Sequence, residues 1–229
     1  MLKNLTNEEK TLKENHKLIK KTLKLVCNKF NKLKVDFYVV GSLSVYLIKN
    51  KLVRYHDDID FMILESDLKK VKKVLSKTNF IFEDNRLSNH RYLSGDSTYT
   101  MGEHELVANH KNKDFHLGFF LINKETNGSI TVKEHFKAKD TEDRYILYKN
   151  TPKKLADMLF NSNVYNFYGA KFKATSPENV YVIKQSTKRE KDKFDLKIWE
   201  EWNIIDKDKV KKILNIEDEF KTHIYFEKI

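Results

Sequence analysis

The sequence contains an apolar run that is interrupted by two carboxylates. Residues 58–64 read DIDFMIL. Side chains alternate between the faces of a strand, so Asp58 and Asp60 are expected on the same face, on either side of Ile59. Two charges beside each other in a buried strand are costly unless a cation lies between them. The run therefore predicts a strand that carries a cation site.

A second apolar run, with a tight turn after it, precedes the acidic pair. Residues 35–40, VDFYVV, have the composition of a strand, and the pattern breaks at Gly41 and Ser42 before a stretch that suits a helix. Glycine lets a phosphate approach the backbone, serine can donate to it, and a helix N-terminus favours an anion. Mg²⁺ takes oxygen ligands and shares them with substrate phosphates. The arrangement predicts a nucleoside triphosphate bound together with Mg²⁺, with Mn²⁺ as the alternative ion.

A displacement assisted by two metal ions needs a third carboxylate on a neighbouring strand. The run 114–122, DFHLGFFLI, is predicted to be that strand, with Asp114 on the same side as His116 and Gly118. Asp114 is therefore the expected third ligand and the expected general base. Glu103 and Glu105 are alternatives, in a stretch with weaker strand character.

The remaining sequence favours an α/β (α+β) fold, with a mixed sheet flanked by helices. Residues 7–33 place apolar side chains at helical intervals, and residues 66–77 form another helical pattern. Short strand-like runs lie at residues 130–136, 144–149 and 170–175.

The pattern becomes helical from Ser176 to the end of the sequence, and Pro177 suits a first helical position. We therefore expect a catalytic domain with an N-terminal amphipathic helix over residues 1–175 and a C-terminal helical region over residues 176–229.

The composition is that of a folded, basic protein. The chain has 229 residues, 40% of them hydrophobic, and a net charge of +11, which suits nucleic acid or a nucleoside triphosphate as partner. Evenly spread lysine is also an ordinary solvated surface, so the charge alone decides little. The sequence has no apolar run of membrane length and no signal-peptide core, and we expect a cytoplasmic protein without a membrane partner.

The order of strand, Gly41-Ser42, helix and Asp58-x-Asp60 resembles the signature of the nucleotidyltransferase superfamily related to DNA polymerase β. The run RYHDDIDF, from Arg54 onward, is similar to the corresponding run of minimal nucleotidyltransferases, which include abortive-infection type IV toxins. His56 stands where those proteins usually carry Ser or Thr. A second match lies in the C-terminal part, at Pro177, Glu178, Lys184, Arg189, Lys191, Asp192, Asp195 and Leu196.

The resemblance implies a Mg²⁺-dependent enzyme that transfers a nucleoside monophosphate to an acceptor hydroxyl and releases pyrophosphate. Two metal ions would be held by Asp58, Asp60 and Asp114. The nucleotide would be bound by Gly41, Ser42, Arg54, Lys184 and Lys191. Pairing with Asp57 or Asp58 is the alternative for Arg54, and helix ion pairs are the alternative for Lys191, Asp192 and Asp195.

The acceptor is left open by the sequence. A tRNA 3′ end is the first expectation, because the basic charge and the resemblance to toxin enzymes agree, and a separate antitoxin protein would then be a partner. An antibiotic or another small hydroxyl compound is the second. A non-catalytic nucleotide-binding or regulatory protein of the same fold is the third.

Overall fold

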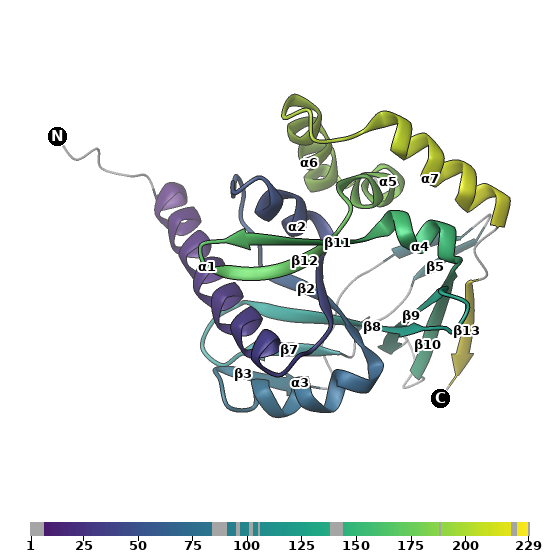
Figure 1. Ribbon diagram of the computed structural model, residues 1–229. Helices are drawn as coiled ribbons and strands as arrows, with labels where there is room; N and C mark the ends of the chain where they lie inside the picture. Colours follow the sequence, from purple (N-terminus) through teal and green to yellow (C-terminus); the bar gives the residue numbers. More distant parts are fainter. Residues whose placement is uncertain are drawn as a thin grey trace.

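The computed structural model describes residues 7–83, 91–94, 97–100, 103–104, 106–137, 144–187, 189–220 and 224–228. At its centre lies an eleven-stranded mixed sheet, and helices flank it (Figure 1). The main path through the sheet has the order β11-β12-β1-β2-β8-β9-β10-β13. The predicted mixed sheet flanked by helices is confirmed.

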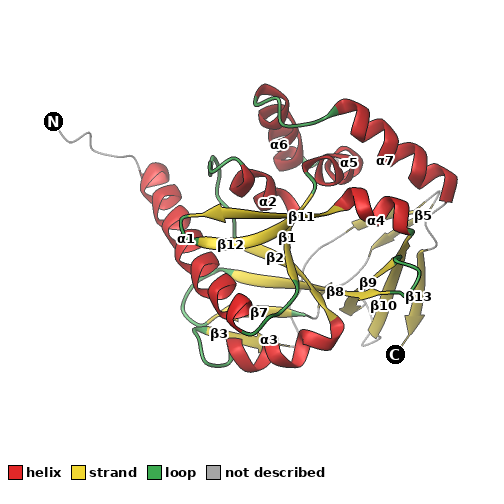
Figure 2. Ribbon diagram, in the orientation of Figure 1, coloured by secondary structure: helices red, strands yellow, loops and turns green. Residues whose placement is uncertain are grey.

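The first part of the chain follows the predicted order. Helix α1 (Asn7–Lys32) lies along the sheet and packs against β12 (Figure 2). Strand β1 (Phe37–Val40), helix α2 (Gly41–Ile48) and strand β2 (Asp58–Leu64) then follow. The Gly41-Ser42 pair therefore begins a helix directly at the end of a strand.

Strand β2 lies between β1, to which it is antiparallel, and β8 (His116–Lys124), to which it is parallel. Its residues Ile59, Phe61 and Ile63 are fully buried, while the residues between them are partly exposed. Phe61 stacks on Phe119 of β8, with ring centroids 5.7 Å apart. Packing of one face of β2 into the core fixes the opposite face as the one that carries the two aspartates.

The other elements extend or connect the sheet, and two of the strands form a separate two-stranded sheet. They are the 3₁₀ turn η1 (Glu65–Asp67), α3 (Leu68–Leu75), β3 (Phe80–Glu83), β4 (Arg91–Ser94), β5 (Ser97–Thr100), β6 (Glu103–His104), β7 (Val107–His110), β9 (Ile130–Lys137), β10 (Arg144–Thr151), α4 (Lys153–Leu159), β11 (Phe160–Phe167) and β12 (Ala170–Thr175). Strands β3 to β7 have four residues or fewer, too short for a clear alternation in the sequence.

The C-terminal helices lie over α2 and α4 (Figure 1). They are α5 (Pro177–Thr187), α6 (Glu190–Glu201) and α7 (Lys207–Phe220). Helices α2, α5 and α6 share a core that includes Tyr46, Val180 and Trp199, and Tyr46 lies edge-on to Trp199 at 6.0 Å. The predicted start of α5 at Pro177 is confirmed.

The expectation that helices continue to the end of the sequence is wrong. Residues 224–228 form strand β13, which pairs antiparallel with β10. The sequence IYFEK has the β-branched and aromatic composition of a strand, and the free edge of β10 gives it a partner. Among the helices that the structure describes, none combines the length and apolar character needed to cross a membrane.

Candidate functional site

The two aspartates lie where the sequence predicts them. Asp58 begins β2, and Asp60 follows on the same face, because Ile59 between them points into the core. Burial raises the pKa of Asp58, and the charge of Asp57 raises it further, while His116, Lys191 and Arg54 act in the opposite direction. A carboxylate whose pKa is raised by desolvation is stabilised in its charged form by a bound cation.

The Asp60 carboxylate lies between two glycines. A Cβ atom added to Gly118 would lie 2.3 Å from Oδ1 of Asp60, and one added to Gly41 would lie 3.2 Å from Oδ2. Gly118 is the partner of Asp60 in the register of β2 and β8, and Gly41 has a φ of +70°. Glycine adopts the positive φ at Gly41 without strain, and at both positions the absence of a Cβ atom leaves room for the Asp60 carboxylate. The end of β1 and the middle of β8 therefore fix the carboxylate from two sides.

The start of α2 presents unpaired donors beside the aspartates. Ser42 is 7% exposed, and within the described residues its Oγ has no hydrogen-bond partner. The N-cap residue Val40 makes no side-chain cap, so the first N–H groups of the helix remain available. A buried hydroxyl without a partner, next to an uncapped helix N-terminus, is the arrangement that a phosphate oxygen satisfies.

His56 fixes the segment that leads to Asp58. The side chain of Asn15 donates to the backbone oxygen of His56 at 2.6 Å and accepts from its backbone N–H at 3.0 Å. The ring lies edge-on to Tyr46 at 5.4 Å, and burial, with the charges of Arg54 and other cations, lowers its pKa to about 2. Its Nε2 is buried and has no partner in the described part of the chain. His56 is thus a neutral ring that packs against the helix of Ser42.

Arg54 forms an ion pair that sequence reasoning missed. Its Nε and Nη2 donate to the two carboxylate oxygens of Asp195 at 2.7 and 2.8 Å, and its Nη1 donates to the backbone oxygen of Tyr55 at 2.9 Å. The expected alternative partners, Asp57 and Asp58, are not the ones it pairs with. The distance of 141 residues between Arg54 and Asp195 along the chain hides this pair from any local pattern.

Other residues of the C-terminal match also form ion pairs within the protein. Asp192 is fully buried and accepts hydrogen bonds from Lys184 at 2.8 Å, Arg189 at 2.6 and 3.1 Å, and Thr187 at 2.7 Å. The expected helix ion pairs are thus present at Asp192, although one of its partners lies on α5. The ammonium of Lys184 is paired with Asp192 in this structure. A contact between Lys184 and the nucleotide stays a prediction.

Lys191 differs from the other cations of this match. It is exposed, and no ion pair joins it to a carboxylate in the described residues, yet its positive charge acts on both Asp58 and His56. Of the predicted nucleotide-binding cations, Lys191 is therefore the one whose charge remains free for a bound anion.

The structure corrects the expected position of Asp114. Residues 111–115 form the turn of the β7–β8 hairpin, closed by a hydrogen bond from the His110 N–H to the Phe115 oxygen, and β8 begins only at His116. Asp114 is exposed in this turn. Asp58 lies opposite His116. Glu103 begins β6, and Glu105 lies outside the described residues.

The described residues do not assemble a complete set of three metal ligands. Within the described ranges, no group of three or more histidine, cysteine, aspartate or glutamate side chains is close enough to hold a metal ion. The two carboxylates on one face of β2, one of them with a raised pKa, do fit a hard divalent cation that takes further oxygens from phosphates. The role of Asp114 as third ligand stays a prediction.

The family model of the aminoglycoside-2''-adenylyltransferases matches residues 22–118. This range contains Gly41, Ser42, Asp58, Asp60 and Gly118. No curated protein sequence matches the chain. The family match therefore covers strands β1 to β7, the start of β8 and both aspartates.

Several solved structures are similar to this chain. The solution structure of the antibiotic-resistance factor ANT(2'')-Ia has a TM-score of 0.53 at 9% identity, over 88% of this chain and 94% of that one. Its crystal structure with adenylyl-2''-tobramycin has a TM-score of 0.50 at 9% identity, over 85% and 93%. The lincosamide antibiotic adenylyltransferase LnuA with lincomycin bound has a TM-score of 0.46 at 20% identity, over 80% and 90%.

The chain has the nucleotidyltransferase fold, and the family match together with this fold indicates a nucleotidyltransferase enzyme. The family match and the fold support the superfamily, and the finer resemblance to abortive-infection toxins stays a prediction.

Proposed function

We propose that this protein transfers a nucleoside monophosphate from a nucleoside triphosphate to a hydroxyl group of a small, antibiotic-like acceptor. The observation that carries the proposal is the Asp60 carboxylate held between Gly41 and Gly118. This arrangement places an anionic oxygen ligand directly beside the start of α2, where Ser42 lacks a partner among the described residues. Metal-binding and phosphate-binding groups thus adjoin each other.

Each residue of the site has a distinct part in binding the triphosphate. Asp58 and Asp60 would hold Mg²⁺, which when bound neutralises phosphate charge and polarises the α-phosphorus. The Ser42 hydroxyl and the first N–H groups of α2 would donate to phosphate oxygens. Lys191 would contact the phosphates with its free charge, and that contact strengthens as negative charge moves onto the leaving pyrophosphate.

The reaction is an in-line displacement. The acceptor oxygen forms a bond to the α-phosphorus, the bond from that phosphorus to the bridging oxygen of the β-phosphate breaks, and pyrophosphate leaves with the electron pair. The proton of the acceptor hydroxyl passes to a base near the β7–β8 turn, where Asp114 and His116 are two residues apart. The activities of Asp114→Asn and His116→Gln distinguish these two groups.

An antibiotic-like acceptor is favoured over a tRNA 3′ end. The family model that matches residues 22–118 is that of an aminoglycoside adenylyltransferase. One structure of the same fold contains an adenylylated aminoglycoside. The net charge of +11, which favours tRNA, is spread over the whole chain and does not single out one acceptor.

The test is the transfer of label from each α-³²P-labelled nucleoside triphosphate, in Mg²⁺, to tobramycin, lincomycin or total tRNA. Asp60→Asn is the inactive control, and Asp157→Asn, which removes a carboxylate in an exposed ion pair on α4, is the matched control. We expect a labelled antibiotic with the unmodified protein and with Asp157→Asn only. Label on tRNA alone would show that the acceptor is tRNA and not an antibiotic. No label on any acceptor would contradict the proposal.

A further inference from the structure

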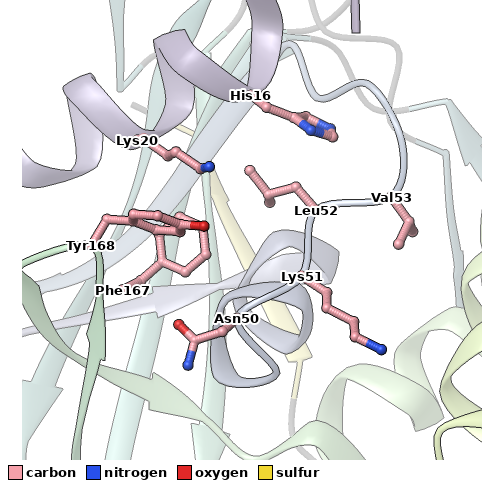
Figure 3. A pocket seen from close by; sticks show the side chains of 8 residues that line it. All are labelled: His16, Lys20, Asn50, Lys51, Leu52, Val53, Phe167 and Tyr168. Carbon is pink, nitrogen blue, oxygen red and sulfur yellow. The ribbon is translucent and has the colours of Figure 1, made fainter. Parts of the chain in front are cut away.

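A second concave site lies between helix α1, the segment that follows α2, and the turn that joins β11 to β12 (Figure 3). The cavity has a volume of about 380 Å³, which is within the range of small-molecule sites. None of the aspartates of the acidic site lines it. Three segments that are far apart in the sequence thus form one pocket.

The pocket is positively charged. Lys20 of α1 and Lys51 of the segment after α2 line it, and no aspartate or glutamate does. In the described part of the chain neither lysine forms an ion pair with a carboxylate. Lys20 lies over the ring of Tyr168, with Nζ 3.9 Å from the centroid, and Lys51 lies 5.3 Å from the Trp202 ring. Cations without a counter-charge in a concave site favour an anion.

Tyr168 gives the pocket an exposed aromatic surface. It is 60% exposed and occupies the first position of the two-residue turn Tyr168-Gly169, with φ values of 49° and 83°. Such turns favour asparagine, aspartate or glycine at the first position, so a tyrosine there is unfavourable for the backbone. Its ring lies edge-on to the buried ring of Phe167 at 4.8 Å. Turn formation does not explain this tyrosine, and its mostly exposed ring leaves surface for contact with a ring-shaped ligand.

Neutral polar groups complete the lining. The Nε2 of His16 lies 3.1 Å from the backbone oxygen of Arg54, so Nε2 carries the proton and Nδ1 is an acceptor. Burial lowers the pKa of His16, and the ring is neutral at physiological pH. The amide of Asn50 and the apolar side chain of Leu52 lie on the neighbouring segment (Figure 3). Polar and apolar groups together suit a base with hydrogen-bonding edges.

We propose that this pocket binds a nucleotide unit, with its phosphate at Lys20 and its base on Tyr168. The unit is either a free nucleoside monophosphate or the terminal nucleotide of an RNA, because both present the same phosphate and base. Aromatic stacking combined with cationic side chains is the usual way in which proteins bind such units. The proposal is independent of the reaction at Asp58 and Asp60.

The test uses the full chain with Asp58→Asn and Asp60→Asn, in the absence of divalent metal, so that the triphosphate site is disabled. AMP, inorganic phosphate and a short RNA oligonucleotide are titrated into it by calorimetry. We expect Lys20→Ala and Tyr168→Asn each to raise the Kd for AMP at least about fivefold. Lys13→Ala, an exposed lysine on the same helix, should leave the Kd unchanged. Asparagine suits the turn, so Tyr168→Asn keeps the fold.

The outcomes separate the two sources of the ligand. RNA that binds more tightly than AMP, with the same sensitivity to the two substitutions, indicates the terminal nucleotide of an RNA. AMP that binds while RNA does not indicates the free nucleotide. The proposal is overturned if phosphate alone binds as well as AMP, if Lys20→Ala and Tyr168→Asn bind like Lys13→Ala, or if no probe binds at about 10 mM.

Discussion

Arg54 binds Asp195 through two parallel hydrogen bonds, and this pair joins the segment before the acidic strand to helix α6. The Asp195 carboxylate is fully buried and also accepts a hydrogen bond from Tyr46 of α2 at 2.5 Å. Three elements that carry or support the site thus meet at one carboxylate. The C-terminal helices are therefore fastened to the catalytic part by side chains close to Asp58.

We predict that Arg54→Ala strongly destabilises the protein, because it leaves the buried Asp195 charge without its main partner. The free energy of unfolding should fall by about 3–5 kcal/mol, measured by urea denaturation. Lys193→Ala, which breaks an exposed pair with Glu190 on the same helix, should have almost no effect. Equal unfolding midpoints for the two variants would show that the buried pair does not fasten α6.

Gly118→Ala should abolish most of the activity while the protein remains folded. The added methyl group would overlap Oδ1 of Asp60 and displace the carboxylate, and a shift of about 1 Å in a reacting group costs about 100-fold in rate. The activity is measured in steady-state assays, and circular dichroism checks that the variant is folded.

Gly169→Ala is the matched control for Gly118→Ala, since Gly169 has a φ of +83° but has only Lys24 near its added methyl group. It should lose stability and keep kcat. Full activity of Gly118→Ala would mean that Asp60 does not take part in the reaction.

Lys191→Ala should raise the KM for the nucleoside triphosphate by about tenfold, because one charge-assisted contact to phosphate is removed. Lys193→Ala is the control, since Lys193 already pairs with Glu190. The difference between the two variants should shrink at high salt, which screens exposed charges. An unchanged KM in Lys191→Ala would exclude this lysine from the nucleotide site.

The Asp192 cluster predicts a stability change in acid. Burial alone would raise the pKa of Asp192, but hydrogen bonds from Arg189, Lys184 and Thr187 outweigh it and hold the pKa well below its usual range. A carboxyl with a lowered pKa contributes stability above its unfolded pKa of about 3.9, and this contribution is lost as the pH falls toward the folded value.

Asp192→Asn should therefore be less stable than the unmodified protein at pH 7, and the gap should narrow below about pH 4. The stability of both proteins is measured by thermal unfolding across this pH range. A gap that stays constant from neutral to acidic pH would show that the charge of Asp192 is not what stabilises the cluster.

The sequence predicted the parts of the site that depend on local periodicity. Asp58 and Asp60 share a face because strand alternation is a local rule, and Ser42 begins a helix because the Gly-Ser break is visible in the sequence. Gly118 could not be assigned a role in this way, because its contact with Asp60 depends on the register of β2 with β8.

The errors have related physical causes. Asp114 continues the alternation of β8 in sequence, and only the closure of the β7–β8 hairpin shows that it lies in the turn. Asp195 pairs with Arg54 across 141 residues, so the tertiary fold, and not the spacing within α6, selects its partner. Strand β13 becomes predictable only once the free edge of β10 is known.

Joint binding of a metal ion and a triphosphate by Asp58 and Asp60 can be measured without knowledge of the acceptor. Mn²⁺ binding is measured by electron paramagnetic resonance, with and without a non-hydrolysable nucleoside triphosphate, for the unmodified protein and for Asp60→Asn. We expect the triphosphate to tighten Mn²⁺ binding to the unmodified protein by about tenfold or more and to have no such effect on Asp60→Asn. Equal binding of Mn²⁺ by the two proteins in the presence of the triphosphate would show that Asp60 does not hold the metal ion.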